Sequence, residues 1–397
     1  MYYLVIFITL CIFALFEQST IYQKRKNVLF FISYLMLMLT AGLRYETGGD
    51  WTSYTEIFNT IEPVDQVLAG NRQYFDWMAG LETGYRYLNS IVKFIVPNVQ
   101  LLFFIVAIII STFIFKGIKQ YCSYPILGVL IYFGILFFAL DMIVLRQGIA
   151  AALVFWGYKY IEDKKFWKFL IICCVASLFH VSALIGILVY FVARPRYPSW
   201  LLITLGVAFV GVLVFHIKWM GDIAVHLLST QIDEGVAEKI VTYTQKDVYA
   251  VSRGITLGLL VNIIVFAVLM IRRKSLENQK HFNLFLNLFV IYLFVYCCLS
   301  EFVEVGNRLK YYFMISFVVL IPQIVASFEE YRLRAISFVG ACMFSLMYCS
   351  AQVFERPIAS AFNPYQNYVM YEMFKYKSDG HQRLDQSDSE FLNERGQ

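Results

Sequence analysis

The stretch that decides the fold is NVQLLFFIVAIIISTFIFKGI, residues 98–118, in which the first charged residue is Lys116. A helix of about 20 mainly apolar residues is long enough to cross the hydrocarbon core of a bilayer. Runs of this kind recur along the chain and predict an all-α polytopic integral membrane protein with about 11–12 membrane crossings. The other runs span residues 2–17, 28–43, 124–140, 143–161, 166–193, 200–217, 253–271, 282–300, 309–327 and 335–353.

The composition excludes a soluble protein. Hydrophobic residues make up 59% and charged residues 15% of the 397 residues, whereas soluble proteins are about 45–50% apolar and about 25% charged. A bilayer can cover that much apolar surface, and water cannot. The charges lie in short clusters between the apolar runs, and no acidic or basic tract suggests a nucleic-acid partner.

No metal or cofactor is predicted. The eight cysteines include no C-x-x-C pair, and no cysteine or histidine spacing is typical of a zinc site, so we interpret them as packing residues. The chain also lacks a Walker loop, an H-E-x-x-H motif and a G-x-S-x-G motif. These absences argue against ATP hydrolysis, a zinc peptidase and a serine hydrolase.

The two ends of the chain differ in character. The first apolar run follows no positively charged region and precedes no small-residue cleavage site, so we interpret it as a retained first helix. We expect a single transmembrane domain over residues 1–353. A polar tail over residues 354–397 follows it, and we expect that tail to be mobile.

Lys and Arg clusters set the predicted orientation, because short loops rich in these residues face the cytoplasm. They place the N-terminus outside, together with the polar segments 44–84 and 218–252. In the first of these segments, Trp51, Tyr54 and Phe58 recur at helical spacing. This spacing predicts short amphipathic helices that lie on the membrane.

The run over residues 166–193 does not fit simple alternation of sides, because basic clusters at 159–168 and 194–196 flank it. A single crossing cannot place both clusters inside, and the run is too short for two full crossings. A broken or re-entrant helix pair with His180 at its tip would satisfy both clusters. The alternative is one tilted helix with a misplaced arginine pair.

The first candidate constellation follows the second apolar run and combines Arg44, the Gly48-Gly49 pair, Asp50, Trp51 and Tyr54. An arginine, a flexible glycine pair, an acid and aromatic rings can form an anion site with a carboxylate beside it. Two simpler interpretations stay open. Arg44 would only reach lipid headgroups, and Asp50 would only cap the helix that holds Trp51.

The second candidate is the Arg146-Gln147 pair, which lies about one turn inside an apolar helix. An arginine within the membrane costs about 2.5 kcal/mol or more, so it rarely lacks a role. The alternative is a structural ion pair with Asp141 or another carboxylate.

The third candidate is His180, which is either a general base, because its pKa lies near neutrality, or a hydrogen-bonded core residue. The fourth is the segment with Glu301, Asn307 and Arg308, which is otherwise an ordinary charged loop. The predicted topology puts all four groups on the outer side. Three arginines beside candidate bases predict an anionic ligand, since arginine binds phosphate oxygens bidentately.

Four segments of the chain belong together: GLRYETGGDWTSYTEIF, LRQGIAAALVFWGYKYI, ASLFHVSALIGILVYFV and NRLKYYF. They resemble the EpsG family, a branch of the Wzy-like bacterial polysaccharide polymerases, and the resemblance covers residues 1–375. One detail differs, because a Gly-Thr-Asp type of triplet is here Gly48-Gly49-Asp50. The family's motif residues fall on Arg44, Gly48, Gly49, Asp50, Arg146, Gln147, Phe179, His180 and Arg308.

The resemblance implies a metal-independent glycosyltransferase at the outer face of the bacterial cytoplasmic membrane. It would join undecaprenyl-pyrophosphate-linked oligosaccharide repeat units into capsule, exopolysaccharide or O-antigen. Expected partners are membrane lipid and the flippase and chain-length regulator of the same pathway. The expected catalytic residues are His180, Asp50 and Glu301. The residues expected to bind pyrophosphate or glycan are Arg44, Arg146, Gln147, Asn307, Arg308, Trp51 and Tyr54.

Two other functions stay open on the sequence. A flippase or exporter of lipid-linked oligosaccharides would also use arginines for pyrophosphate, although transporters often show repeated halves and polar groups near the bilayer midplane. A membrane acyltransferase would need a histidine and a carboxylate facing an acyl-donor tunnel.

Overall fold

The all-α prediction is confirmed by a computed structural model, which describes residues 1–19, 25–217, 256–300, 303–354 and 359–395. Helices and no strands form over these ranges. The expected external loop 218–252 lies outside the described residues. Within these described ranges, four stretches are long and apolar enough to cross a membrane, and seven further apolar helices are shorter. These four are Val99–Tyr121, Pro125–Ile143, Val305–Ala326 and Tyr331–Val353.

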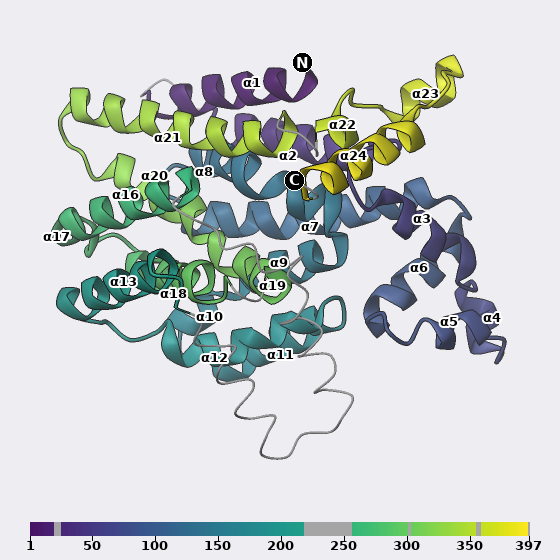
Figure 1. The fold of residues 1–397 in the computed structure, drawn as a ribbon, viewed down its shortest axis with the longest axis horizontal. Coiled ribbons are helices and arrows are strands. Elements are labelled where there is room, and N and C mark those ends of the chain that lie inside the picture. Colours follow the sequence, from purple (N-terminus) through teal and green to yellow (C-terminus); the bar gives the residue numbers. More distant parts are fainter. Residues whose placement is uncertain (20–24, 218–255, 301–302, 355–358, 396–397) are drawn as a thin grey trace. The chain divides into compact units, whose positions relative to one another are not determined.

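The chain divides into two compact units, unit 1 over residues 1–190 and 321–397, and unit 2 over residues 191–320. The helices of unit 1 come from both ends of the chain (Figure 1). They are α1 (Tyr2–Glu17), α2 (Lys26–Gly42), α3 (Trp51–Thr60), α4 (Val64–Leu68), α5 (Gln73–Trp77), α6 (Thr83–Ile95), α7 (Val99–Tyr121), α8 (Pro125–Tyr132), η2 (Phe133–Ile143), α9 (Leu145–Gly157), α10 (Lys159–Glu162), α11 (Phe166–Ser177), η3 (Val181–Leu184), α12 (Ile185–Val192), α21 (Tyr331–Val353), α22 (Ala359–Phe362), α23 (Tyr368–Phe374) and α24 (Gly380–Arg395).

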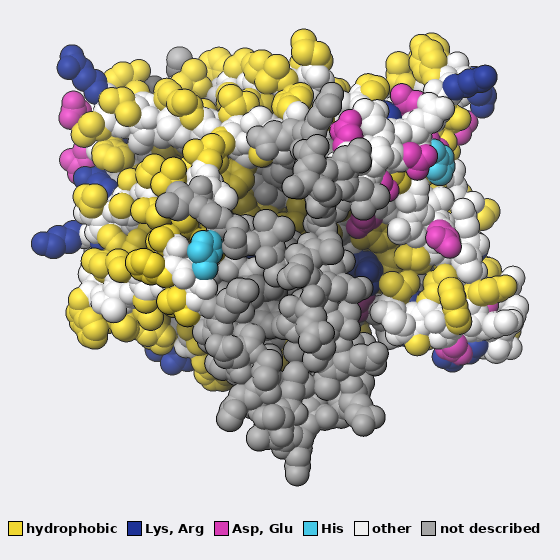
Figure 2. All heavy atoms as spheres, in the orientation of Figure 1, with side chains coloured by type: hydrophobic (Ala, Val, Ile, Leu, Met, Phe, Trp, Pro, Cys, Tyr) yellow, Lys and Arg dark blue, Asp and Glu magenta, His cyan; other side chains and the backbone are white. Residues whose placement is uncertain are grey.

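The helix α7 is the centre of unit 1 and packs against both α2 and α9. The Asn98 side chain begins this helix, since its Oδ1 accepts the Gln100 backbone N–H at 2.8 Å. Leu102, Val106 and Ile110 recur every four residues and are all buried, so one stripe of the helix faces the core. The remaining faces of several helices stay apolar and exposed, as a bilayer requires, and Figure 2 shows hydrophobic side chains over much of the described surface.

The two ends of α7 define two ends of unit 1. At the first, which we call the lysine end, Lys26 and Lys119 lie beside the α7–α8 connection, and the Tyr121 hydroxyl donates to the Trp156 carbonyl at 3.0 Å. At the second, which we call the arginine end, α2 finishes before Arg44. The positive-inside rule predicts that the lysine end faces the cytoplasm.

The chain turns back within the run 166–193, as the expected helix pair requires. The helix α11 ends at Ser177, and η3 and α12 run in the opposite direction. The rings of Phe166, which begins α11, and Tyr190, near the end of α12, lie 5.1 Å apart. His180 lies at the tip of this hairpin, between Ser177 and Val181.

The C-terminal segment packs on the loop that follows α2. Its helices α22, α23 and α24 cover residues that we expected in a polar tail. Ring contacts join Trp51 to His381 at 4.8 Å and Tyr45 to Tyr371 at 4.2 Å. Backbone hydrogen bonds join Tyr45 to Gln366, Gly48 to Ala361 and Tyr368 to Leu43.

Unit 2 is a smaller bundle. Its interior holds Leu213, Leu259, Cys297 and Cys298. The buried Asn287 amide donates to the carbonyls of Ala193 and Pro195 at 2.8 and 2.7 Å, which ties α18 to the segment before α13. The helix α20 (Ser316–Ala326) runs from unit 2 into unit 1, and the other helices of unit 2 are α13 (Ser199–Val214), α16 (Leu257–Ile271), α17 (Arg273–Leu276), α18 (Phe282–Cys298) and α19 (Val303–Met314).

Candidate active site

A break between two helices builds the centre of the arginine end. The π-helix η2 stops at Ile143, and Val144 takes the non-helical conformation φ −92°, ψ 63° before α9 begins at Leu145. Arg146 therefore lies in the first turn of α9. Backbone groups next to such a break have no partner within their own helix, so other segments must supply one.

Arg44 is buried and reaches this break. Only 2% of its surface is exposed, its Nη1 donates to the Asp141 carbonyl oxygen, and its guanidinium lies 5.0 Å from the centre of the Phe103 ring. Burial lowers the pKa of Arg44 to about 10, so it keeps its charge at neutral pH. Because the side chain is enclosed, the alternative in which it only reaches lipid headgroups is wrong. Its Nε and Nη2 have no hydrogen-bond partner within the described residues.

The loop after Arg44 brings Asp50 to the surface. Gly48 has φ +104°, and a β-carbon there would lie 2.7 Å from the Met142 carbonyl oxygen, so the close approach requires glycine. Asp50 is exposed and occupies the N-cap position of α3, but its side chain makes no cap hydrogen bond. The Asp50 side chain therefore does not cap α3, and the capping alternative is wrong.

Tyr54 connects α3 to the start of α9. Its hydroxyl oxygen accepts the Leu145 backbone N–H at 3.0 Å, and its ring lies 5.9 Å from that of Tyr85. Burial, and then the negative charge of Asp50, raise the pKa of Tyr54 to about 12, while Arg146 acts in the opposite direction. The hydroxyl thus lies in the electric field of both a carboxylate and a guanidinium.

Arg146 pairs with Glu82, a residue that sequence reasoning missed. Its Nη1 lies 2.5 Å from Glu82 Oε2, and the side chains are 28% and 15% exposed. The sequence left open an ion pair with Asp141 or another carboxylate, and the structure shows the second of these, because the Asp141 carboxylate accepts the Tyr132 hydroxyl instead. A carboxylate just before the helical period of α6 was the only sequence signal for Glu82.

Glu82 also holds the tip of the hairpin. Its Oε1 accepts the Val181 backbone N–H at 3.3 Å. Beside it, the Gly84 N–H donates to the Leu178 carbonyl at 2.8 Å. His180 lies between these two attachment points, is 7% exposed, and places its Nδ1 2.5 Å from the Ser182 hydroxyl.

The structure thus brings five predicted residues of unit 1 into one neighbourhood with Glu82. Two more lie beside them, because Trp51 is buried under α24 and Gln147 is buried on α9. The five are Arg44, Asp50, Tyr54, Arg146 and His180.

The remaining predicted residues belong to unit 2 or to undescribed positions. Asn307 and Arg308 lie on α19, where Asn307 Oδ1 accepts from Lys310 Nζ at 2.9 Å and Arg308 is exposed. Glu301 lies outside the described residues. The roles of these three residues stay predictions.

Chemically, the arginine end offers positive charge beside carboxylates and an imidazole. Such an arrangement can bind an anion and place a proton acceptor near it. Among the residues that the structure describes, no group of three His, Cys, Asp or Glu side chains could hold a metal ion.

Comparison with known proteins identifies the family. The model of the EpsG family matches residues 27–367, which include every residue of this neighbourhood. The chain belongs to the EpsG family. Membership suggests a polysaccharide polymerase-like function for this multi-pass membrane protein. Searches of the curated proteins and of the solved structures returned no match.

Proposed function

We propose that this EpsG-family chain is a glycosyltransferase that polymerises oligosaccharide repeat units carried on undecaprenyl pyrophosphate, at the outer face of the bacterial cytoplasmic membrane. A hydroxyl of the acceptor unit attacks the anomeric carbon of the donor chain. The new carbon–oxygen bond forms as the bond to pyrophosphate breaks. Undecaprenyl pyrophosphate leaves with the electron pair, and a base takes the hydroxyl proton.

The two arginines of unit 1 would act differently in this reaction. Arg146 is 28% exposed along its side chain, so it can bind the departing pyrophosphate directly. Arg44 is buried and donates to the Asp141 carbonyl, so it would act without touching the pyrophosphate. It would add positive charge to the site and fix the position of the helix break. Preorganised charges of this kind stabilise a leaving group whose negative charge grows in the transition state.

Two side chains in unit 1 are candidates for the base. Asp50 is exposed and lies close enough to Tyr54 to raise the pKa of its hydroxyl. His180 is buried, with Nδ1 on Ser182, and has the side chain whose ordinary pKa is nearest to neutrality. His180→Ala should abolish an acidic limb in the pH profile if His180 is the base, whereas Asp50→Asn should lower the rate at every pH tested.

The observation that carries the proposal is the Arg146 position, because a partly exposed guanidinium stands at a helix start beside a carboxylate and the hairpin tip. A guanidinium binds pyrophosphate through two parallel N–H groups, and the point charge of a lysine ammonium does not reproduce this geometry. Arg146→Lys should therefore lose most polymerisation while the protein accumulates normally, and Arg146→Ala should lose about 100- to 1,000-fold in rate.

The test is the lipid-linked glycan profile of cells that carry each variant. Long polymer should give way to single repeat units or short ladders. Normal polymer length from a well-accumulated Arg146→Ala protein would contradict the proposal. In a deletion strain, single units on lipid support a polymerase, whereas long chains trapped inside the cell would indicate an exporter.

A further inference from the structure

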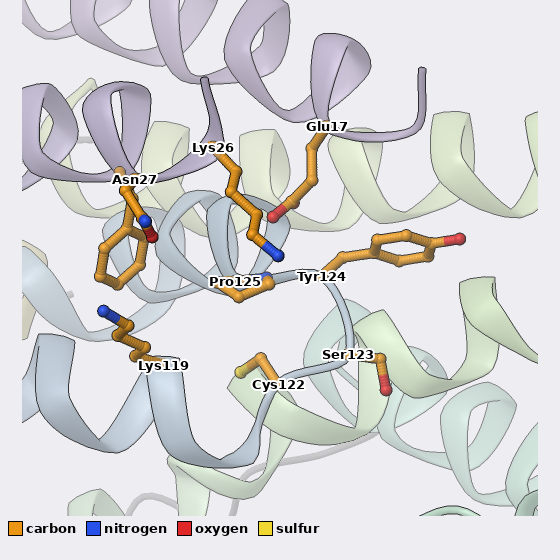
Figure 3. Close-up of a pocket in the computed structure, with 9 residues that line it drawn as sticks. Glu17, Lys26, Asn27, Lys119, Cys122, Ser123, Tyr124 and Pro125 are labelled. Carbon is orange, nitrogen blue, oxygen red and sulfur yellow. The ribbon is translucent and has the colours of Figure 1, made fainter. Parts of the chain in front are cut away.

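A second charged cavity lies at the opposite end of unit 1. It encloses about 300 Å³ beside the connection between α7 and α8. Figure 3 shows that the Lys26 amine is directed towards the space between Glu17 and Pro125, and that the Lys119 amine is directed towards Asn27. We call this cavity the lysine pocket, and its other lining residues include Phe30 and Ser123.

The acid in the pocket has a structural task. The Glu17 carboxylate accepts the backbone N–H groups of Ile126 and Leu127 at 3.0 Å, which caps the start of α8. A carboxylate at a helix N-terminus is stabilised by the unsatisfied N–H groups there. The lining described for this cavity holds two lysines and one carboxylate, so its formal charge is positive.

The surface around the pocket indicates the kind of ligand. On α1, Leu15 and Phe16 are 61% and 54% exposed, and on α2, Val28 and Phe31 are 57% and 56% exposed. These side chains suit contact with lipid tails at the same level as the lysines. A ligand that combines a phosphate with acyl chains matches both features, whereas a free phosphate would make no contact with these apolar side chains.

We propose that the lysine pocket binds the phosphate of an anionic glycerophospholipid in the cytoplasmic leaflet. Basic pockets between transmembrane helices on the cytoplasmic side suit anionic headgroups. The side assignment follows from the positive-inside rule. Lys26 would contact the phosphate from the start of α2, and Lys119 from the last turn of α7.

This site is separate from the arginine end. The helix α2 contains 17 residues between Lys26 and Gly42, which is about 25 Å at 1.5 Å per residue. Lipid binding at the lysine pocket therefore does not depend on the proposed polymerase reaction, and the two proposals fail independently.

Lipid binding to the purified full-length protein tests the site. Dioleoyl phosphatidylglycerol and dioleoyl phosphatidylcholine are titrated in detergent and bound lipid is counted by native mass spectrometry. Lys26→Gln and Lys119→Gln should each weaken phosphatidylglycerol binding about fivefold, and the double variant about 25-fold, with little change for phosphatidylcholine. Both lysines are exposed, so the variants should fold.

The matched control is Lys116→Gln, which removes an exposed charge from the same helix but lies outside the pocket lining. Its phosphatidylglycerol affinity should equal that of the unaltered protein. Equal weakening by Lys116→Gln and Lys119→Gln would mean general surface attraction and overturn the site. Displacement of the lipid by millimolar inorganic phosphate would also overturn it, since the pocket would then select a free anion.

Discussion

Exchanging the charges of Arg146 and Glu82 tests whether Arg146 acts in catalysis or only stabilises the fold. The pair has an N–O distance of 2.5 Å and is only 28% and 15% exposed. A hydrogen bond between charged groups contributes about 1.5–3 kcal/mol, which we reduce to about 1–2 kcal/mol for the partial exposure. Glu82→Gln should lower stability by this amount, and it should slow polymerisation by about 10- to 100-fold, because a misplaced catalytic group is costly.

The double variant Glu82→Arg/Arg146→Glu restores an opposite-charge pair in reverse order. We expect protein abundance and thermal stability in detergent to recover relative to either single exchange. Polymer length on a glycan gel should not recover, because the guanidinium no longer stands at the start of α9. Recovery of normal polymer length would refute the reasoning, since the pair would then serve structure alone.

The surface pair Arg72 and Asp76 provides the control for this exchange. Its N–O distance is similar, 2.7 Å, but both side chains are 51% exposed. Reversing these two charges should leave abundance, stability and polymer length unchanged, because solvent screens an exposed ion pair and it adds little to stability.

Three further predictions concern topology and packing. A cysteine at Thr60 should react with an impermeant thiol reagent in intact cells or spheroplasts, and labelling only after lysis would contradict an external segment 44–84. A reporter fused after Tyr197 should read cytoplasmic, whereas a periplasmic reading would mean that residues 166–193 cross once. Gly84→Val should reduce abundance, because a β-carbon there would lie 2.8 Å from the Leu178 carbonyl, and Gly80→Val, which meets nothing within 4 Å, should not.

Local sequence patterns sufficed for the helices and for the hairpin. The residues of α7 are apolar almost throughout, so the sequence predicts a helix that crosses the membrane but does not show which of its faces is buried. The hairpin followed from a charge argument, because two basic clusters flank one run. Both inferences need only neighbouring residues and the bilayer as a solvent.

The sequence did not show which side chains pair with one another. Arg146 and Glu82 are 64 positions apart, and Asp141, the nearer carboxylate in sequence, faces Tyr132 instead. The enclosure of Arg44 also depends on distant segments, including the C-terminal residues that bond to its loop. Sequence spacing identifies side chains that need partners, but the partners themselves are set by packing between helices.

The segment 44–85 has a larger part in the site than an amphipathic surface layer would have. Broken helices expose backbone groups that need partners where water is scarce. At the arginine end, four such backbone groups form hydrogen bonds with this one segment. Two of the partners are charged side chains, one is a tyrosine hydroxyl and one is a backbone N–H. The groups belong to Asp141, Leu145, Leu178 and Val181, and their partners are Arg44, Tyr54, Gly84 and Glu82, respectively. The segment therefore fixes the helix start that carries Arg146 and the turn that carries His180, so loosening it should disturb both residues together.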